Sequence, residues 1–146
     1  RHRHQPVGDN KGCSEELRAL QVQHFDPILA WLASTYAAPF VITNGLMPVP
    51  QPAASVQKIA AEFAAANNHE LAALTLMVPI LGSALLALAL WRKKITTEAA
   101  LVACRLDETV QAQHWGEDAE VAAKWASKAR DVKAAAFFLH EHPENA

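Results

Sequence analysis

The chain has 146 residues, the size of a single domain with one hydrophobic core. Hydrophobic residues make up 51% of it and charged residues 19%, a globular rather than a disordered composition. The net charge of −2 and the scattered basic residues argue against a nucleic-acid partner. Alanine is abundant whereas aromatic and β-branched residues are sparse, so the composition predicts an all-α protein.

The first segments predict a polar tail followed by a helix. Residues 1–13 are polar and contain glycine and proline, and we interpret them as an N-terminal tail. Ser14 precedes two glutamates and is therefore predicted to cap a helix that continues to about Tyr36. Within it, Asp26-Pro27 predicts a kink or two abutting helices, because proline lacks an N–H donor. The helical domain as a whole is expected to cover residues 14–142.

A proline-rich segment separates the first helix from the rest of the chain. Prolines at alternate positions in GLMPVPQP (45–52) are incompatible with a helix. We therefore expect a short extended strap over 39–52, followed by a helix from Ala53 to about Asn67.

Residues 71–91 carry no charge and are long enough for a transmembrane helix. Amphipathic helices on either side would have nothing to cover if this segment lay in lipid. The sequence thus favours a compact helical bundle around a central apolar helix at about 70–92, not a membrane span. Pro79 predicts a kink in it, and Gly82 a close helix–helix approach. A small membrane protein built on this segment is the less favoured alternative.

Thr96 predicts the N-cap of a further helix over 96–115, and Gly116 separates it from a last helix at about 117–141. One stripe of the 96–115 helix is apolar and predicted to face the core: Ala99, Val102, Ala103, Leu106 and Val110. A second stripe is apolar except for a carboxylate and an amide: Leu101, Cys104, Glu108, Gln111 and Trp115.

Two interpretations of this second stripe remain open. In the first, favoured by spacing alone, Arg105 pairs with Glu108 and Trp115 completes the core. In the second, Glu108 is a charged anchor and Trp115 an aromatic anchor of a protein-recognition patch. A carboxylate on a partly apolar face is costly unless it is paired or presented to a partner.

The sequence contains no motif that supports catalysis or cofactor binding. It lacks a nucleophile elbow, a glycine-rich phosphate loop and the Cys-x-x-Cys and His-Glu-x-x-His metal motifs. Cys13 and Cys104 are therefore expected to be unpaired thiols in a reducing compartment. We expect a protein-binding module that is not an enzyme and needs no cofactor.

Four stretches carry a resemblance to a known family. HFDPILAW (24–31), GLMPVPQP (45–52), LGSALLALAL (81–90) and RLDETVQAQHWGEDAE (105–120) occur in the order found in the ATP12 family of F1-ATPase assembly chaperones. The second and fourth stretches are the specific ones. The resemblance implies a helical protein without catalytic activity that holds the F1 α subunit before it joins β, shielding the surface that β later covers.

The resemblance also implies a site and a location. The family relies on the acidic position that Glu108 matches, and the predicted partner-binding residues are Glu108, Arg105, Asp107, Gln111 and Trp115. The expected partner is the F1 α subunit or another mitochondrial complex component. The expected location is the mitochondrial matrix, or the matrix-facing side of an inner-membrane complex.

The sequence departs from the family pattern in two respects. Family members carry a β-rich domain before the helical one, and residues 1–13 correspond at most to its end. Phe25 stands where the family usually has tryptophan. The alternative function is therefore a permanent structural subunit of a large mitochondrial complex, derived from the ATP12 helical domain.

Overall fold

The structure, a computed structural model, describes residues 7–41 and 51–141, with side chains for 15–41 and 51–140. Within these ranges the regular structure consists of α-helices alone, which confirms the predicted all-α class. The helices are α1 (Val7–Tyr36), α2 (Ala53–Ala64), α3 (Asn68–Leu81), α4 (Ala84–Trp91), α5 (Thr97–Ala103), α6 (Leu106–Trp115) and α7 (Ala119–Glu141).

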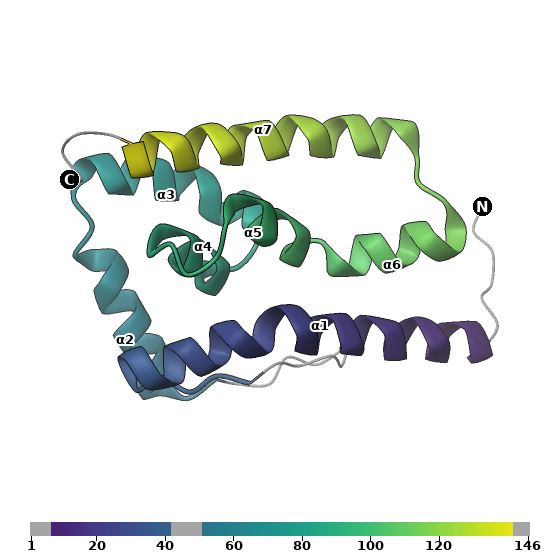
Figure 1. Ribbon diagram of the computed structural model, residues 1–146, viewed down its shortest axis with the longest axis horizontal. Coiled ribbons are helices and arrows are strands. Elements are labelled where there is room, and N and C mark those ends of the chain that lie inside the picture. Colours follow the sequence, from purple (N-terminus) through teal and green to yellow (C-terminus); the bar gives the residue numbers. More distant parts are fainter. Residues whose placement is uncertain (1–6, 42–50, 142–146) are drawn as a thin grey trace.

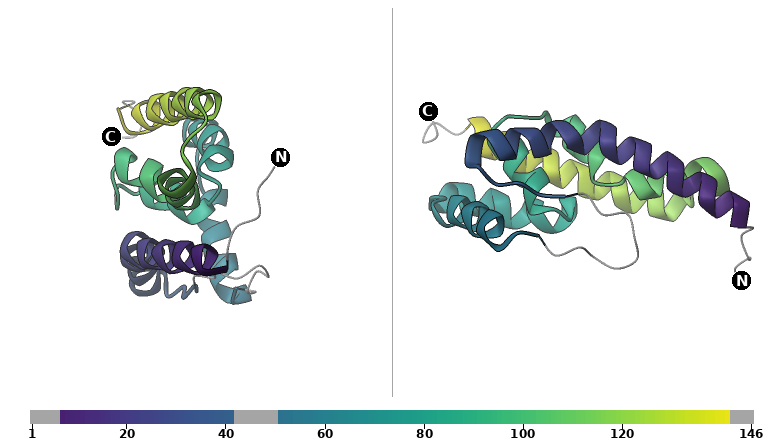
Figure 2. Two further views of the ribbon diagram at one scale, coloured as in Figure 1. Left: turned by 90° about the vertical axis from the view of Figure 1, so that its right-hand side faces the viewer. Right: turned by 90° about the horizontal axis from the view of Figure 1, so that it is seen from below.

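The helices lie in three layers (Figure 1). Helices α3 and α7 form one outer layer, α1 and α2 form the other, and α4, α5 and α6 lie between them. Figure 2 shows from the end of the molecule that α1 and α7 lie on opposite sides of this middle layer. Helix α3 packs along α7, and α6 packs along α1.

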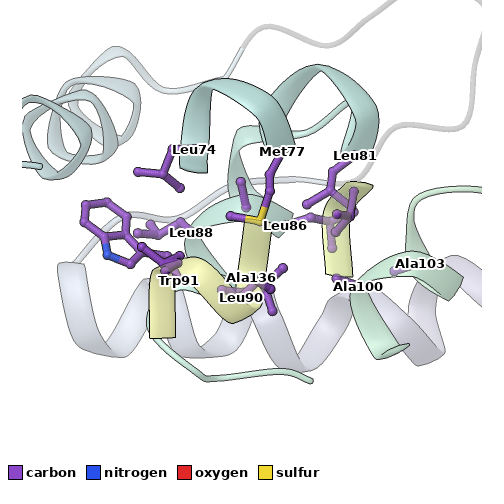
Figure 3. Packing of buried hydrophobic residues seen from close by; sticks show 14 of the residues in the cluster. Leu74, Met77, Leu81, Leu86, Leu88, Leu90, Trp91, Ala100, Ala103 and Ala136 are labelled. Carbon is purple, nitrogen blue, oxygen red and sulfur yellow. The ribbon is translucent and has the colours of Figure 1, made fainter. Parts of the chain in front are cut away.

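The hydrophobic core is centred on α4. This helix is apolar all round, and all its residues from Leu86 to Trp91 are buried. A helix with no polar face is stable only when other helices cover it on every side. Figure 3 shows the residues that do so, which come from α3, α5 and α7: Leu74, Met77, Leu81, Ala100, Ala103 and Ala136.

The single central helix predicted over 70–92 is wrong, because the chain breaks at Gly82 and Ser83. Gly82 adopts the left-handed conformation (φ 68°), and its N–H donates to the Val78 carbonyl at 2.9 Å. The Ser83 hydroxyl then accepts from the Leu86 N–H at 3.2 Å and caps α4. The apolar segment is therefore two helices, α3 and α4, that pack on each other. No helix in the described ranges is long and apolar enough to cross a lipid bilayer.

Helix α1 is longer than the sequence predicts. It begins at Val7 instead of Ser14 and passes through Pro27 without ending, so the two-helix alternative is wrong. Lengthening an existing helix is far less costly than starting one, and packing beyond the proline holds the chain in place. Ile28 and Leu32, in the turns after Pro27, are buried in the core. Residues 1–6 of the predicted tail lie outside the described residues.

The predicted strap is described only at its two ends, since residues 42–50 lie outside the described ranges. The Val41 N–H donates to Gln51 Oε1 at 3.0 Å, and Gln51 Nε2 donates to the Val41 carbonyl at 2.9 Å. Two reciprocal hydrogen bonds therefore bring the beginning and the end of this connection together.

The helix predicted over 96–115 is also two helices. Thr96 caps the first as predicted, since its hydroxyl accepts from the Ala99 N–H at 3.0 Å. The second begins after Arg105, whose backbone (φ −135°, ψ 43°) is not helical. This break changes the phase of the apolar stripe. Leu106 and Val110 are buried as predicted, whereas Val102 is 49% exposed.

Candidate functional site

A surface cleft of about 280 Å³ lies where the α5–α6 junction and α6 face α7. Helix α6 and the beginning of α7 lie at the end of the molecule where α1 begins (Figure 1). The cleft is lined by residues from three parts of the fold: Ile80 of α3; Cys104, Arg105 and Glu108 of the junction and α6; and Val121, Lys124, Trp125 and Lys128 of α7. Apolar and charged side chains thus share one concave surface.

Arg105 connects the α5–α6 junction to α7. Its guanidinium lies 4.7 Å from the centre of the Trp125 ring and 3.5 Å from a carboxylate oxygen of Glu117. The predicted ion pair between Arg105 and Glu108 is therefore wrong. The non-helical backbone of Arg105 breaks the i, i+3 geometry on which that prediction relied. Only 18% of the Arg105 side chain is exposed, so it forms part of the wall of the cleft.

Glu108 lies in the first turn of α6, is exposed and lines the cleft. Among the described residues it forms no ion pair. Burial raises the pKa of the neighbouring Cys104 thiol to about 11; the Glu108 carboxylate raises it too, and Arg105 opposes the shift. The Cys104 thiol also donates to the Leu101 carbonyl at 3.3 Å. Cys104 is therefore neutral at physiological pH and behaves as an apolar part of the cleft.

The other three predicted site residues lie on α6 outside the cleft lining. Asp107, Gln111 and Trp115 are all exposed. Trp115 is 42% exposed, so the prediction that it completes the core is wrong. Gln111 and Trp115 follow Glu108 by three and seven residues, which places them on the same side of α6. The structure thus brings Arg105 and Glu108 into the cleft and leaves an exposed α6 surface beside it.

The cleft also contains residues that the sequence analysis missed. Lys124 and Lys128 are exposed, lie one turn apart on α7 and, within the part of the chain that the structure describes, form no ion pair. Trp125 lies between them in sequence and is half-buried. Two lysines at i and i+4 beside a tryptophan are a visible pattern on an amphipathic helix. The sequence alone does not show that they share a cleft with Glu108.

No protein-family model matches the chain. Among solved structures, ATP12 from Paracoccus denitrificans superposes with a TM-score of 0.81 at 36% identity, over 86% of this chain and 54% of that one. An aspartate-to-lysine variant of the Paracoccus protein gives a TM-score of 0.80 at 33% identity, over 94% and 55%. The chain has the fold of the ATP12 family.

A third match is a candidate chaperone from Agrobacterium tumefaciens, with a TM-score of 0.73 at 30% identity, over 91% of this chain and 57% of that one. The chain therefore spans about half the length of each ATP12-like structure that it matches. These comparisons confirm the resemblance to the ATP12 family. Of the stretches that carried it, 105–120 contains Arg105 and Glu108 of the cleft.

Proposed function

We propose that this chain is an assembly chaperone that holds the F1-ATPase α subunit before it joins β. The proposal is supported by the ATP12 fold and by structural neighbours that include ATP12 and a candidate chaperone. The observation that carries it is the cleft at the 105–120 segment, where Glu108 lies unpaired among the described residues beside an apolar wall. The proposed location is the mitochondrial matrix, where F1 would be assembled.

The surface suits the task physically. An unassembled subunit exposes apolar interface that aggregates unless another protein covers it. Val121 in the cleft is 50% exposed, and Trp115 on the adjoining α6 surface is also accessible. Apolar side chains of this kind supply contact area, while Glu108 supplies orientation and specificity. Holding a subunit is a binding equilibrium, so the proposal requires neither catalysis nor a cofactor.

The proposal is tested with isolated F1 α subunit. We expect the chain to bind it at a one-to-one ratio and to suppress its aggregation, measured by calorimetry and light scattering. Glu108→Lys should abolish binding with helicity unchanged. Glu98→Lys is the matched control, because it makes the same charge reversal in the first turn of another helix, α5, at an exposed position outside the cleft. It should retain binding.

Two results would reject the proposal. One is failure of the unmodified chain to bind the α subunit. The other is its recovery as a stoichiometric component of a mature isolated complex, which is the behaviour of a permanent subunit.

A further inference from the structure

The charges of the cleft that have no partner among the described residues are positive on α7 and negative on α6. Lys124 and Lys128 extend from α7, and Glu108 extends from the first turn of α6. None of the three forms an ion pair with a described residue. The fourth charge of the lining, Arg105, is already paired with Glu117 and stacked on Trp125. Two lysines and one glutamate therefore remain for a partner.

The surface between these charges is apolar. Ile80, Val121 and Trp125 line it, together with the neutral thiol of Cys104. An apolar side chain placed here removes apolar area from water, which favours the complex.

We propose that the cleft binds a segment of the partner that carries both charges: an acidic side chain against Lys124 and Lys128, an apolar one over Val121 and Trp125, and a basic one against Glu108. This inference rests on the proposed function, because it takes the segment to belong to the F1 α subunit. It adds the chemistry of the recognised segment and makes the two lysines of α7 determinants of specificity together with Glu108.

Charge complementarity selects this occupant over the simpler ones. An entirely apolar segment would cover two ammonium groups and a carboxylate without pairing them, which costs free energy. An entirely acidic segment would be repelled by Glu108, and an entirely basic one by Lys124 and Lys128. Only a segment with both an acidic and a basic side chain can pair Lys124, Lys128 and Glu108 together.

The test uses a charge reversal and a matched control. The cleft variant is Lys124→Glu with Lys128→Glu. The control is Lys93→Glu with Lys94→Glu, which reverses two exposed lysines between α4 and α5, outside the cleft. Both variants should keep the helical circular dichroism and melting curve of the unmodified chain.

The first arm measures affinity for isolated F1 α subunit. We expect the cleft variant to bind about tenfold or more weakly, because both ion pairs become repulsions, and the control to bind unchanged. If the unmodified chain does not bind α, the proposed function fails. If the cleft variant binds as well as the control, the proposed function stands and this inference is overturned.

The second arm is independent of the α subunit. Four short peptides with the same central leucine carry one acid and one base, two acids, two bases, or two glutamines at the flanking positions. Binding is followed by NMR titration of the amides from Lys124 to Lys128 and of the Trp125 indole.

The unmodified chain should prefer the peptide with both signs. The cleft variant, whose free charges are then all negative, should prefer the basic one. Equal binding of the four peptides, or the same preference in both proteins, would contradict the inference.

Discussion

The guanidinium of Arg105 lies 4.7 Å from the centre of the Trp125 ring and also forms an ion pair with Glu117 at 3.5 Å. Arg105 is the non-helical residue between α5 and α6, whereas Trp125 and Glu117 belong to α7 and the loop before it. One side chain therefore makes two contacts that bridge the two sides of the cleft. Its substitution should alter both the stability and the shape of this region.

Arg105→Ala should lower the free energy of unfolding by about 1–2 kcal/mol, the combined size of a cation–π contact and a partly exposed ion pair. Arg105→Lys should have a smaller effect, because it keeps the charge but loses the flat stacking surface. The measurements are denaturant unfolding and the NMR signal of the Trp125 indole. Arg130→Ala, at an exposed arginine of α7, is the control. An unmoved Trp125 signal in Arg105→Ala would show that the stacking is absent in solution.

Gly82 should tolerate asparagine better than alanine. Its φ is +68°, and a Cβ there would meet no atom within 4 Å, so the cost of substitution is backbone strain alone. Gly82→Ala should therefore destabilise the protein by about 1–2 kcal/mol. Gly82→Asn should cost less, since asparagine adopts the left-handed conformation more readily. Equal melting temperatures for the two variants would contradict this account of the α3–α4 break.

Much of the fold is readable from the sequence because its determinants are local. The alanine-rich composition correctly predicts an all-α fold. The Thr96 cap and the break at Gly116 are also predicted correctly. The break at Gly82-Ser83 was also readable, as a C-cap glycine followed by an N-cap serine, but the uncharged run around it concealed it. No such signal marks the break at Cys104-Arg105, which has neither glycine nor proline. Tertiary packing decides it.

The site was less predictable because it is made by contacts distant in sequence. Spacing placed Glu108 beside Arg105, but the true partner of Arg105 is Glu117, across the loop between two helices. The lysines of the cleft belong to α7, and only the packing of that helix brings them into the same cleft as Glu108. A pattern along one helix does not show which other helix it faces.

Leu88→Ala should lower the free energy of unfolding by about 2–5 kcal/mol, because Leu88 is fully buried in α4 and its truncation leaves a cavity. Leu71→Ala is the comparison, since Leu71 on α3 is 50% exposed and its loss should cost less than about 1 kcal/mol. Chemical denaturation measures both. Similar effects at the two positions would mean that α4 is not the centre of the core.

Cys104 should be alkylated slowly at neutral pH. Its pKa is raised from 9.0 to about 11, so at pH 8 the folded protein holds about 100-fold less thiolate than an unperturbed cysteine. The rate of reaction with iodoacetamide, measured in a Cys13→Ser background, should keep rising with pH and level off only near pH 11, whereas an unperturbed thiol levels off near pH 9. Glu108→Gln should shift this rise to lower pH, because the carboxylate contributes to the raised pKa.

The same shift has a consequence for stability. A raised folded-state pKa means that the neutral thiol is favoured in the folded protein. This preference stabilises the folded protein fully below about pH 9, and the stabilisation is lost as the pH rises through about 11. Cys104→Ala should remove this part of the alkaline decline in melting temperature. If the decline in melting temperature is the same in Cys104→Ala, other titratable groups cause it.

Helix α7 is anchored unevenly along its length. Val132, Ala135, Ala136 and Leu139 are buried, all in its C-terminal half, whereas every residue from Ala119 to Val121 is exposed. Amide hydrogen exchange should therefore slow progressively from the beginning of α7 to its end. The part that carries Lys124 and Lys128 has no fully buried residue and is held mainly by Trp125, which packs against the core and stacks on Arg105. Widening of the cleft to fit a segment therefore requires release of the Arg105 contacts with Trp125 and Glu117, while the buried C-terminal half of α7 stays in place.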